Sequence, residues 1–297
     1  FDEIYEKGKD GSNRDPDVEW IELDTTLNPH LDQVSIASQA AAWDETTRLV
    51  RIKGQPLRFS NRIHPLFTDV PQYWSFSVGK PVAQVEGDVD IVPFCHVEEF
   101  EHSRSWPVVW VLDPHPRKPH MMMWAQVTPS DDIQVVAEAE ITGDPVEVKK
   151  RCDEIEGEMG LSVRSWIGDP NMLRSPSGAS REVLWLDEFR GAGIPVEVGA
   201  DSDVGRARIN EYLKPDPYTR RPRLVVHRRC VQTIYQMKRF VWDEFRRRQD
   251  KDIKQQPRAK YDDFPAMLRY LMNSTPDFRF LVAGAPVLHT GRTVRRA

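Results

Sequence analysis

The apolar residues of the chain fall in short runs separated by turn-forming segments, and these runs predict strands. Five consecutive apolar residues, Val108 to Leu112, leave no polar face and therefore predict a strand that is buried on both faces of a sheet. Residues 119–127 and 133–141 are two further strand candidates, joined by the turn-forming sequence TPSDD. Three neighbouring strands with short connections predict an antiparallel meander.

Helices and strands alternate after this meander. Asp144 and Pro145 suit the start of a helix and Gly160 suits its end, which predicts a helix at 145–159. A strand at 163–169 follows. The later expected elements are helices at 181–190, 203–213, 231–245 and 262–273 and strands at 194–198 and 224–227. The order strand, strand, strand, helix, strand, helix, strand predicts an α/β fold of the ribonuclease-H-like kind, which is a mixed sheet flanked by helices.

The first part of the chain, residues 1–75, has no steady hydrophobic period and predicts a mostly helical linker. Within it we expect a helix at 34–42 and a strand at 48–54. Residues 82–85 and 91–94 are further strand candidates. The pattern therefore predicts a linker at 1–75 followed by one α/β domain at 76–297.

Two of the predicted strands end at an Asp-Pro pair, Asp113-Pro114 and Asp169-Pro170. Proline has no N–H with which to continue a ladder, so each carboxylate is expected at the carboxyl edge of the sheet. One such pair alone is usually only a turn. Right-handed crossovers, however, would place these two strands side by side, and Asp113 and Asp169 would then lie close together.

A third acidic pair, Asp262 and Asp263, opens the helix expected at 262–273, where the helix dipole favours negative charge. Ordinary helix capping is the alternative interpretation. Carboxylates crowded at one place repel each other unless a cation compensates, and oxygen ligands favour Mg²⁺ or Mn²⁺.

Two such ions about 3.5–4 Å apart can activate a water and stabilise the leaving oxygen of a phosphodiester. The pattern therefore predicts a metal-dependent nuclease.

The net charge of −5 hides a strong asymmetry along the chain. Residues 206–260 contain 17 Lys and Arg against 6 Asp and Glu, a balance of +11, so the remainder carries −16. Such a basic block suits the DNA backbone, although a solvated helix face is the simpler alternative. The candidate DNA-contact residues are Arg220, Arg221, Arg223, Arg228, Arg229, Lys238, Arg239, Arg246, Arg247 and Arg248.

Composition narrows the protein class. With 39% hydrophobic residues and no apolar run near ~18 residues, the chain is expected to be globular and not to span a membrane. Three scattered cysteines fit reduced thiols in a cytosol, and nothing marks the chain for secretion. The first residue is Phe1 rather than Met, so we expect a fragment or a processed product.

Several histidines also lie near the predicted acids. His115 and His120 flank Asp113, and could orient water or phosphate or be ordinary loop and strand residues. His96 and His102 lie near Cys95, but no paired zinc-type spacing accompanies them.

Four segments resemble the C-terminal nuclease domain of the large terminase subunit of tailed bacteriophages. They are VVWVLDPHPRKPHMMMWAQV, SWIGDPN, LDEFRGAGIPVEVGADSDVGRARINEYL and DDFPAMLRYLM, within roughly residues 48–273. The resemblance implies an enzyme that cuts concatemeric viral DNA during genome packaging. It implies metal ligands at Asp113, Asp169 and, by position, Asp262. The mechanism expected on this basis is two-metal hydrolysis of DNA, in which Asp113 would bridge both ions and Asp169 and Asp262 would each complete a coordination shell. Asp263 stands where the family often has a histidine, so either acid of this pair can be the third ligand.

The resemblance also implies partners and a location. The partners are double-stranded DNA, the portal protein, the small terminase subunit and the ATPase domain of the same full-length protein, and the place is the procapsid in the bacterial cytoplasm. Residues 1–75 would be the tail of that ATPase domain. The chain departs from the family pattern in two places: it has no GxxxxGK[ST] loop, and Ala266 replaces an acid of the last motif.

Two other functions fit the same residues. A resolvase or transposase of the same fold would join DNA strands as well as cut them. A non-catalytic module that binds DNA or docks on the portal would use the same acids only as helix caps.

Overall fold

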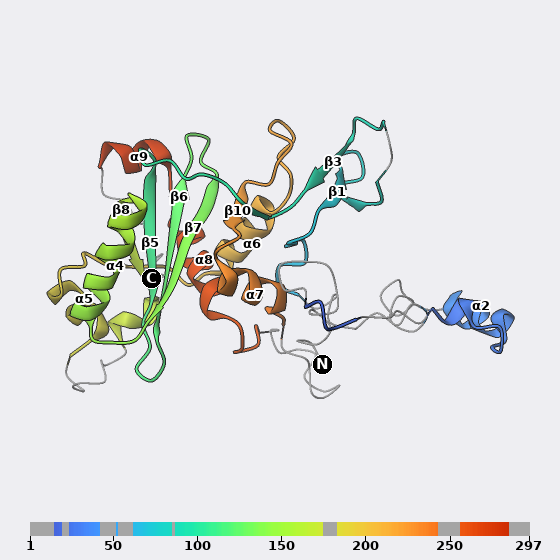
Figure 1. Ribbon diagram of the computed structural model, residues 1–297, viewed down its shortest axis with the longest axis horizontal. Helices are drawn as coiled ribbons and strands as arrows, with labels where there is room; N and C mark the ends of the chain where they lie inside the picture. Colours follow the sequence, from blue (N-terminus) through green and yellow to red (C-terminus); the bar gives the residue numbers. More distant parts are fainter. Residues whose placement is uncertain are drawn as a thin grey trace, which may run out of the picture. The chain divides into compact units, whose positions relative to one another are not determined.

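The computed structural model describes residues 15–19, 24–41, 52, 62–84, 87–174, 183–242 and 256–284. The chain divides into two compact units, one of residues 1–65 with 239–258 and the other of residues 66–238 with 259–297. The second unit contains the main sheet (Figure 1). No helix among the described residues is long and apolar enough to cross a membrane.

The predicted meander is the centre of this sheet. Strands β5 (Pro107–Asp113), β6 (His120–Val127) and β7 (Ile133–Ile141) pair antiparallel, with Trp110 opposite Trp124 and Trp124 opposite Ala137. Every residue of β5 and β6 is buried, because helices cover both faces of the sheet. The uninterrupted apolar run in β5 therefore reflects its central position.

Parallel strands extend the meander on both sides. β8 (Ser162–Gly168) lies beside β5, and β9 (Glu197–Val198) lies beside β8. On the other side β10 (Leu224–His227) lies between β7 and β4 (Val97–Glu98). The strand order is β4-β10-β7-β6-β5-β8-β9. Its β7-β6-β5-β8-β9 part, with only β6 antiparallel to the others, is the ribonuclease-H-like arrangement that the sequence predicts.

Helices cover both faces of the sheet (Figure 1). On one face, α4 (Pro145–Met159) and α5 (Trp185–Gly191) share a core with Val108, Trp110 and Leu112. On the other face, Val109 and Val111 contribute to a core shared with four helices. These helices are α6 (Asp203–Tyr212), α7 (Val231–Arg239), α8 (Asp263–Asn273) and α9 (Phe278–Ala283).

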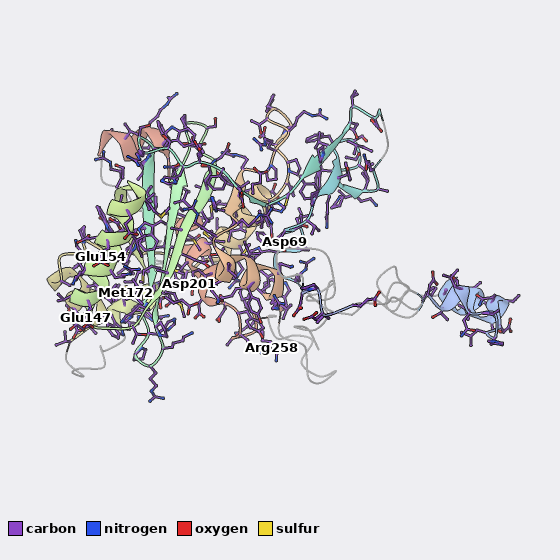
Figure 2. The ribbon with its side chains drawn as sticks, in the orientation of Figure 1. Asp69, Glu147, Glu154, Met172, Asp201 and Arg258 are labelled. Carbon is purple, nitrogen blue, oxygen red and sulfur yellow. The ribbon has the colours of Figure 1, made fainter. Side chains whose placement is uncertain are left out.

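Local signals explain why α4 has the predicted limits. The Asp144 carboxylate accepts hydrogen bonds from the N–H groups of Val146 and Glu147, and the Glu147 carboxylate accepts one from the Asp144 N–H. Glu147 is labelled in Figure 2. Gly160 ends the helix at φ 66°, a left-handed conformation that favours glycine.

A smaller sheet precedes the main one in the chain. β1 (Gln72–Ser75) pairs antiparallel with both β2 (Lys80–Val82) and β3 (Ile91–Phe94), around a core of Trp74, Val92 and Phe94. Short helices complete the described elements: α2 (Gln33–Ala41), and the 3-10 turns η1 (Thr25–Leu27) and η3 (Pro170–Leu173).

Some predicted elements are shorter than expected. The strand predicted at 194–198 is reduced to Glu197–Val198, because Pro195 lacks an N–H and Ile194 donates its own N–H to Phe189 O, which closes a turn after α5. The helix predicted at 231–245 ends at Arg239, and Val241 instead forms an antiparallel bridge with Arg62.

Other predictions fall partly outside the described residues. The helix predicted at 181–190 begins at Trp185, with residues 181–182 outside the described part. The strand candidate at 82–85 is mostly wrong, because β2 ends at Val82 and residues 83–84 are not in a strand; residue 85 is not described. The strand predicted at 48–54 lies outside the described residues except for residue 52.

Candidate metal centre

The first two predicted acids follow adjacent parallel strands. Leu112 of β5 is in register with Gly168 of β8, and the N–H of Asp169 donates to Leu112 O at 2.9 Å. Asp113 and Asp169 therefore lie at the same carboxyl edge of the sheet, as the sequence predicts. The Asp169 carboxylate also accepts from the Asn171 N–H at 2.9 Å and thereby caps η3.

The third acid in this cluster is Asp263. Ligand atoms of Asp113, His115 and Asp263 all lie within 4.8 Å of one another. His115 Nε2 is 3.6 Å from Asp113 Oδ2 and 3.3 Å from Asp263 Oδ1. Asp262, the acid carried over by position, precedes α8 and makes no side-chain cap bond. Of the two alternatives left open by the sequence, Asp263 is the one in this close group.

Packing of α8 explains why Asp263 faces the strands. The buried side chains of Phe264, Met267 and Leu268 belong to the core that also contains Val109 and Val111 of β5. The Phe264 N–H donates to the Gln236 side chain of α7 at 2.9 Å, which fixes the start of the helix. The N-terminal turn of α8 is thus held against the end of β5.

Electrostatics differ sharply between the two clustered acids. Burial raises the pKa of Asp113 to about 7, and the charges of Asp169 and Asp263 add to this rise while His115 opposes it. Burial also raises the pKa of Asp263, but His115 and Lys118 outweigh it and hold the value at about 2. The Lys118 ammonium lies 2.6 Å from Asp263 Oδ1. Without a further cation, the site disfavours a negative charge on Asp113.

The donor set fits a divalent metal ion. His115 Nε2 is buried, yet it has no hydrogen-bond partner among the residues that the structure describes. Its position between two carboxylates suits an ion pair with them when the imidazole is protonated, and a ligand for a divalent ion when the imidazole is neutral. The set of one imidazole nitrogen and several carboxylate oxygens is compatible with first-row divalent ions such as Mn²⁺.

Tyr270 of α8 is a neighbour of the acids that the sequence does not reveal. Burial raises the pKa of its phenol, and the charges of Asp169 and Asp113 raise it further. Gly199 packs against this residue, since a Cβ added at Gly199 would come within 3.2 Å of Tyr270 Cβ and 3.0 Å of Gly168 O. Tyr270 is therefore a buried neighbour of the two carboxylates. A tyrosine in an apolar helical pattern gives no sequence signal of such a position.

Two further acids of this edge pair with arginines. Asp201 lies 2.7 Å from Arg269, and Asp203 pairs with Arg206. Asp201 is labelled in Figure 2. The close group of metal-ligating atoms found among the described residues does not include either acid.

Several candidate DNA-contact residues are engaged within the protein. Arg223 pairs with Asp132 at 2.9 Å and lies over the Tyr212 ring at 4.2 Å. Lys238 pairs with the buried carboxylate of Asp69 at 3.0 Å. Arg239 is itself buried. These contacts show that the three side chains interact within the protein. Their contact with DNA stays a prediction.

The other candidates have weaker or more exposed contacts. Arg221 lies 3.2 Å from Glu98, and Arg228 lies 3.8 Å from Glu99. Arg220 donates to Val89 O and lies over the Phe76 ring, while Arg229 donates to His227. Arg246, Arg247 and Arg248 lie outside the described residues.

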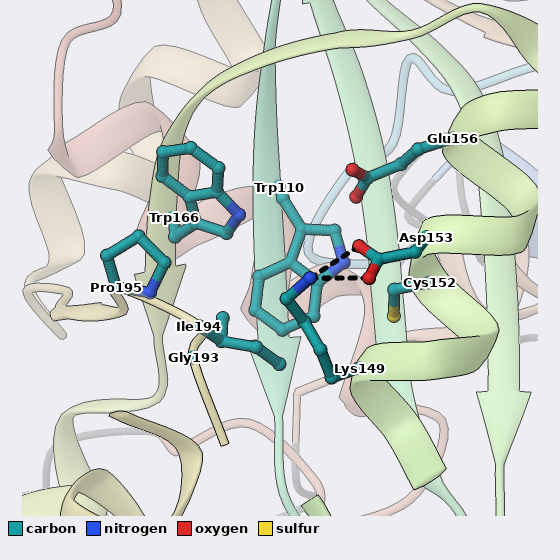
Figure 3. A pocket seen from close by; sticks show the side chains of 9 residues that line it. All are labelled: Trp110, Lys149, Cys152, Asp153, Glu156, Trp166, Gly193, Ile194 and Pro195. Carbon is teal, nitrogen blue, oxygen red and sulfur yellow. Dashed lines mark hydrogen bonds and ion pairs between the residues drawn. The ribbon is translucent and has the colours of Figure 1, made fainter. Parts of the chain in front are cut away.

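A separate cavity of about 280 Å³ lies on the face of the sheet that α4 and α5 cover (Figure 3). Trp110 of β5 and Trp166 of β8 line it, together with Asp153 and Glu156 of α4 and the turn at Ile194. The Lys149 ammonium and the Asp153 carboxylate form an ion pair at its wall. None of the predicted acids lines this cavity, so it is not part of the candidate metal centre.

The chain is similar in structure to large terminases of bacteriophages, at low sequence identity. No protein-family model matches the chain, and no curated protein matches it. It is similar in structure to the large terminase of the thermophilic bacteriophage D6E, with 14% identity and a TM-score of 0.47 over 60% of this chain and 41% of that chain. It is also similar to the P22 large terminase nuclease domain, with 12% identity and a TM-score of 0.41 over 58% and 83%.

A further similar structure is the large terminase nuclease of the thermophilic phage G20c with bound magnesium. It shares 9% identity with this chain, at a TM-score of 0.36 over 56% of this chain and 80% of that chain. The chain thus spans about two fifths of the length of the D6E terminase and four fifths of the G20c nuclease.

Proposed function

We propose that the chain is the nuclease part of the large terminase subunit of a tailed bacteriophage. Its activity would be a metal-dependent endonucleolytic cut in concatemeric double-stranded DNA during genome packaging. The observation that carries this proposal is the cluster of Asp113, His115 and Asp263 at the carboxyl edge of a ribonuclease-H-like sheet, with Asp169 directly after the adjacent strand.

The cofactor would be Mg²⁺ or Mn²⁺, as two ions held by Asp113, Asp169 and the acids Asp262 and Asp263. When bound, these ions activate a water and stabilise the leaving oxygen of the phosphodiester. The protein residues hold the site: β5 and β8 fix Asp113 and Asp169, and α8 fixes Asp263. Tyr270 is buried close to Asp169 and Asp113.

The partners would be double-stranded DNA, the portal protein, the small terminase subunit and an ATPase domain of the same full-length protein. Residues 1–75 would be the tail of that ATPase domain and residues 76–297 the nuclease domain. The place of action would be the procapsid in the bacterial cytoplasm. The basic balance of residues 206–260 supports the DNA partner.

A plasmid-nicking assay with Mn²⁺ tests this function. Asp113→Asn and Asp169→Asn each remove a charged ligand while they preserve side-chain shape, so each should lower the nicking rate at least about 100-fold. Asp187→Asn is the matched control, because Asp187 is an exposed acid of α5 away from the cluster, and it should nick like the unchanged protein.

The same assay separates the alternatives. Equal nicking by all purified proteins would mean that the acids only cap structure, as in a non-catalytic DNA-binding or portal-docking module. Supplying DNA ends together with Mn²⁺ tests the transposase-type alternative, since joined products would appear there. A terminase nuclease should produce only cut products.

A further inference from the structure

The short loop between β5 and β6 is held by a buried histidine. His120 is only 3% exposed, and its Nδ1 accepts a hydrogen bond from the backbone N–H of His115 at 3.1 Å. Its Nε2 lies 3.1 Å from Gly143 O. A ring nitrogen that accepts from an N–H carries no proton, so Nε2 carries the proton and donates to Gly143. These two partners define the tautomer of His120.

Aromatic packing fixes the plane of the same ring. Trp185 and Phe189 of α5 approach His120 edge-on, at centroid distances of 5.1 and 5.5 Å and interplanar angles of 83° and 89°. The imidazole therefore cannot turn without breaking its contacts with α5. Through its Nδ1, this fixed ring holds the backbone at His115.

The side chain of His115 lies between the two clustered carboxylates. Its Nε2 is buried and makes no hydrogen bond with any described residue, although Asp263 Oδ1 lies 3.3 Å away and Asp113 Oδ2 3.6 Å away. A protonated imidazole there would form an ion pair with each carboxylate, whereas a neutral one presents a lone pair to the space among the three side chains. The second arrangement makes Nε2 a ligand for an ion held by all three groups.

We propose that His115 is a metal ligand through Nε2 and that His120 is the positioning residue that holds it there, so that the site prefers Mn²⁺ over Mg²⁺. This inference rests on the proposed metal-dependent function. An imidazole nitrogen suits first-row transition ions, whereas Mg²⁺ keeps oxygen ligands and waters. A site of carboxylates alone would discriminate less between the two ions.

Calorimetric titration and pulsed electron paramagnetic resonance of bound Mn²⁺ test the proposal without any activity measurement. The unchanged protein should show ¹⁴N coupling to bound Mn²⁺ and should bind Mn²⁺ at least about tenfold more tightly than Mg²⁺. His115→Asn should lose the coupling and should weaken Mn²⁺ about 10- to 100-fold, with a smaller effect on Mg²⁺.

Two variants of His120 separate positioning from mere stability. His120→Phe keeps the aromatic packing but removes both hydrogen bonds, so it should weaken Mn²⁺ binding about tenfold. In His120→Asn the amide oxygen stands near the place of Nδ1 and can accept the His115 N–H, so it should restore part of that affinity. His30→Asn, an exposed histidine of the other compact unit, should bind both ions unchanged.

Distinct results separate failure of this inference from failure of the proposed function. Mn²⁺ bound to the unchanged protein without ¹⁴N coupling would overturn the role of His115 and leave the carboxylate site intact. No Mn²⁺ or Mg²⁺ binding at all would overturn the proposed function itself. Because the coupling is measured on the unchanged protein, the test holds even if His120→Phe does not fold.

Discussion

Lys118 neutralises Asp263 where a metal ion would need that carboxylate. Its ammonium lies 2.6 Å from Asp263 Oδ1, although half of the lysine side chain is exposed. An exposed ion pair contributes little, so we expect Lys118→Gln to tighten Mn²⁺ binding by about twofold to fivefold, as the lysine no longer competes for the oxygen. Titration calorimetry measures this change.

The neighbouring Arg117 provides the control for this experiment. Its side chain is exposed, and Arg117→Gln removes a charge from the same loop without touching Asp263. Weaker Mn²⁺ binding in Lys118→Gln than in Arg117→Gln would show that Lys118 supports the site rather than competes with the ion.

The sequence indicates Asp113 and Asp169 but cannot choose between Asp262 and Asp263. Two consecutive residues at a helix start point about 100° apart, so the choice depends on how α8 rotates about its axis. That rotation is set by the contacts of Phe264 with the core and with Gln236, which are distant in sequence. His115 has a sequence signal, two residues after Asp113, but its ligand role needs the spatial position of Asp263.

Helices α6 and α8 approach each other closely at Gly205. An added Cβ there would meet Arg269 O at 2.6 Å and Asn273 Nδ2 at 2.7 Å. We therefore expect Gly205→Ala to lower the free energy of unfolding by about 1–3 kcal/mol, because backbone of α8 must move. Since α8 carries Asp263, Mn²⁺ affinity should fall as well. Urea unfolding and calorimetry measure the two effects.

Gly157 is the matched control, because it also lies within a helix. Nothing lies within 4 Å of a Cβ added there, so Gly157→Ala should stabilise the protein by about 0.5–1 kcal/mol. If both substitutions stabilise the protein, the result would contradict the close packing of α6 against α8 at Gly205.

The buried imidazole of His96 ties the segment after β3 to the end of α6. Its Nδ1 accepts from the Thr68 N–H at 3.1 Å, and its Nε2 donates to Leu213 O at 2.7 Å. Burial lowers the pKa of His96 from 6.5 to about 4. A lowered histidine pKa contributes stability above pH 6.5 that is lost as the pH falls toward 4.

Replacing His96 should remove this part of the acid sensitivity. Between pH 6.5 and 4 the unchanged protein should lose up to about 3 kcal/mol more unfolding free energy than His96→Gln. Urea unfolding at several pH values measures both proteins, with His30→Gln as an exposed-histidine control. Parallel pH curves for the unchanged protein and His96→Gln would contradict a buried neutral imidazole.

The central strands and helices can be predicted because their buried positions give a continuous pattern of apolar residues. Strand 133–141, helix 145–159 and strand 224–227 have the predicted limits. β4 has two residues, too few to show a period, and β9 follows the turn around Pro195. The small sheet is predicted only in part, because β1 lies in a segment of mixed composition that is typical of a linker.

Only some of the residues predicted to contact DNA are exposed in the structure. Arg223 and Lys238 are engaged in ion pairs within the protein, whereas the side chains of Arg221 and Arg228 are 72% and 51% exposed. Composition alone cannot distinguish these cases, because the partners Asp132 and Asp69 come from distant parts of the sequence.

Salt dependence of DNA affinity separates the two groups. Arg221→Gln and Arg228→Gln should each weaken binding of any sequence and lower the slope of log affinity against log salt by about 0.9 for each phosphate that the side chain neutralises. Arg151→Gln, an exposed arginine of α4 outside the basic block, should leave the slope unchanged. Lys238→Gln should instead destabilise the fold, since it removes the ammonium that lies 3.0 Å from the buried Asp69 carboxylate. Equal slopes for all variants would contradict the prediction that Arg221 and Arg228 contact DNA phosphates.

A crystal structure of the protein grown with Mn²⁺, with the ions located by their anomalous scattering, would show the metal centre itself. We predict an ion within about 2.5 Å of oxygens from Asp113 and Asp263, at the edge of the sheet beside Asp169. Crystals that contain Mn²⁺ elsewhere, with these carboxylates still paired only to Lys118 and His115, would contradict a metal centre at this edge.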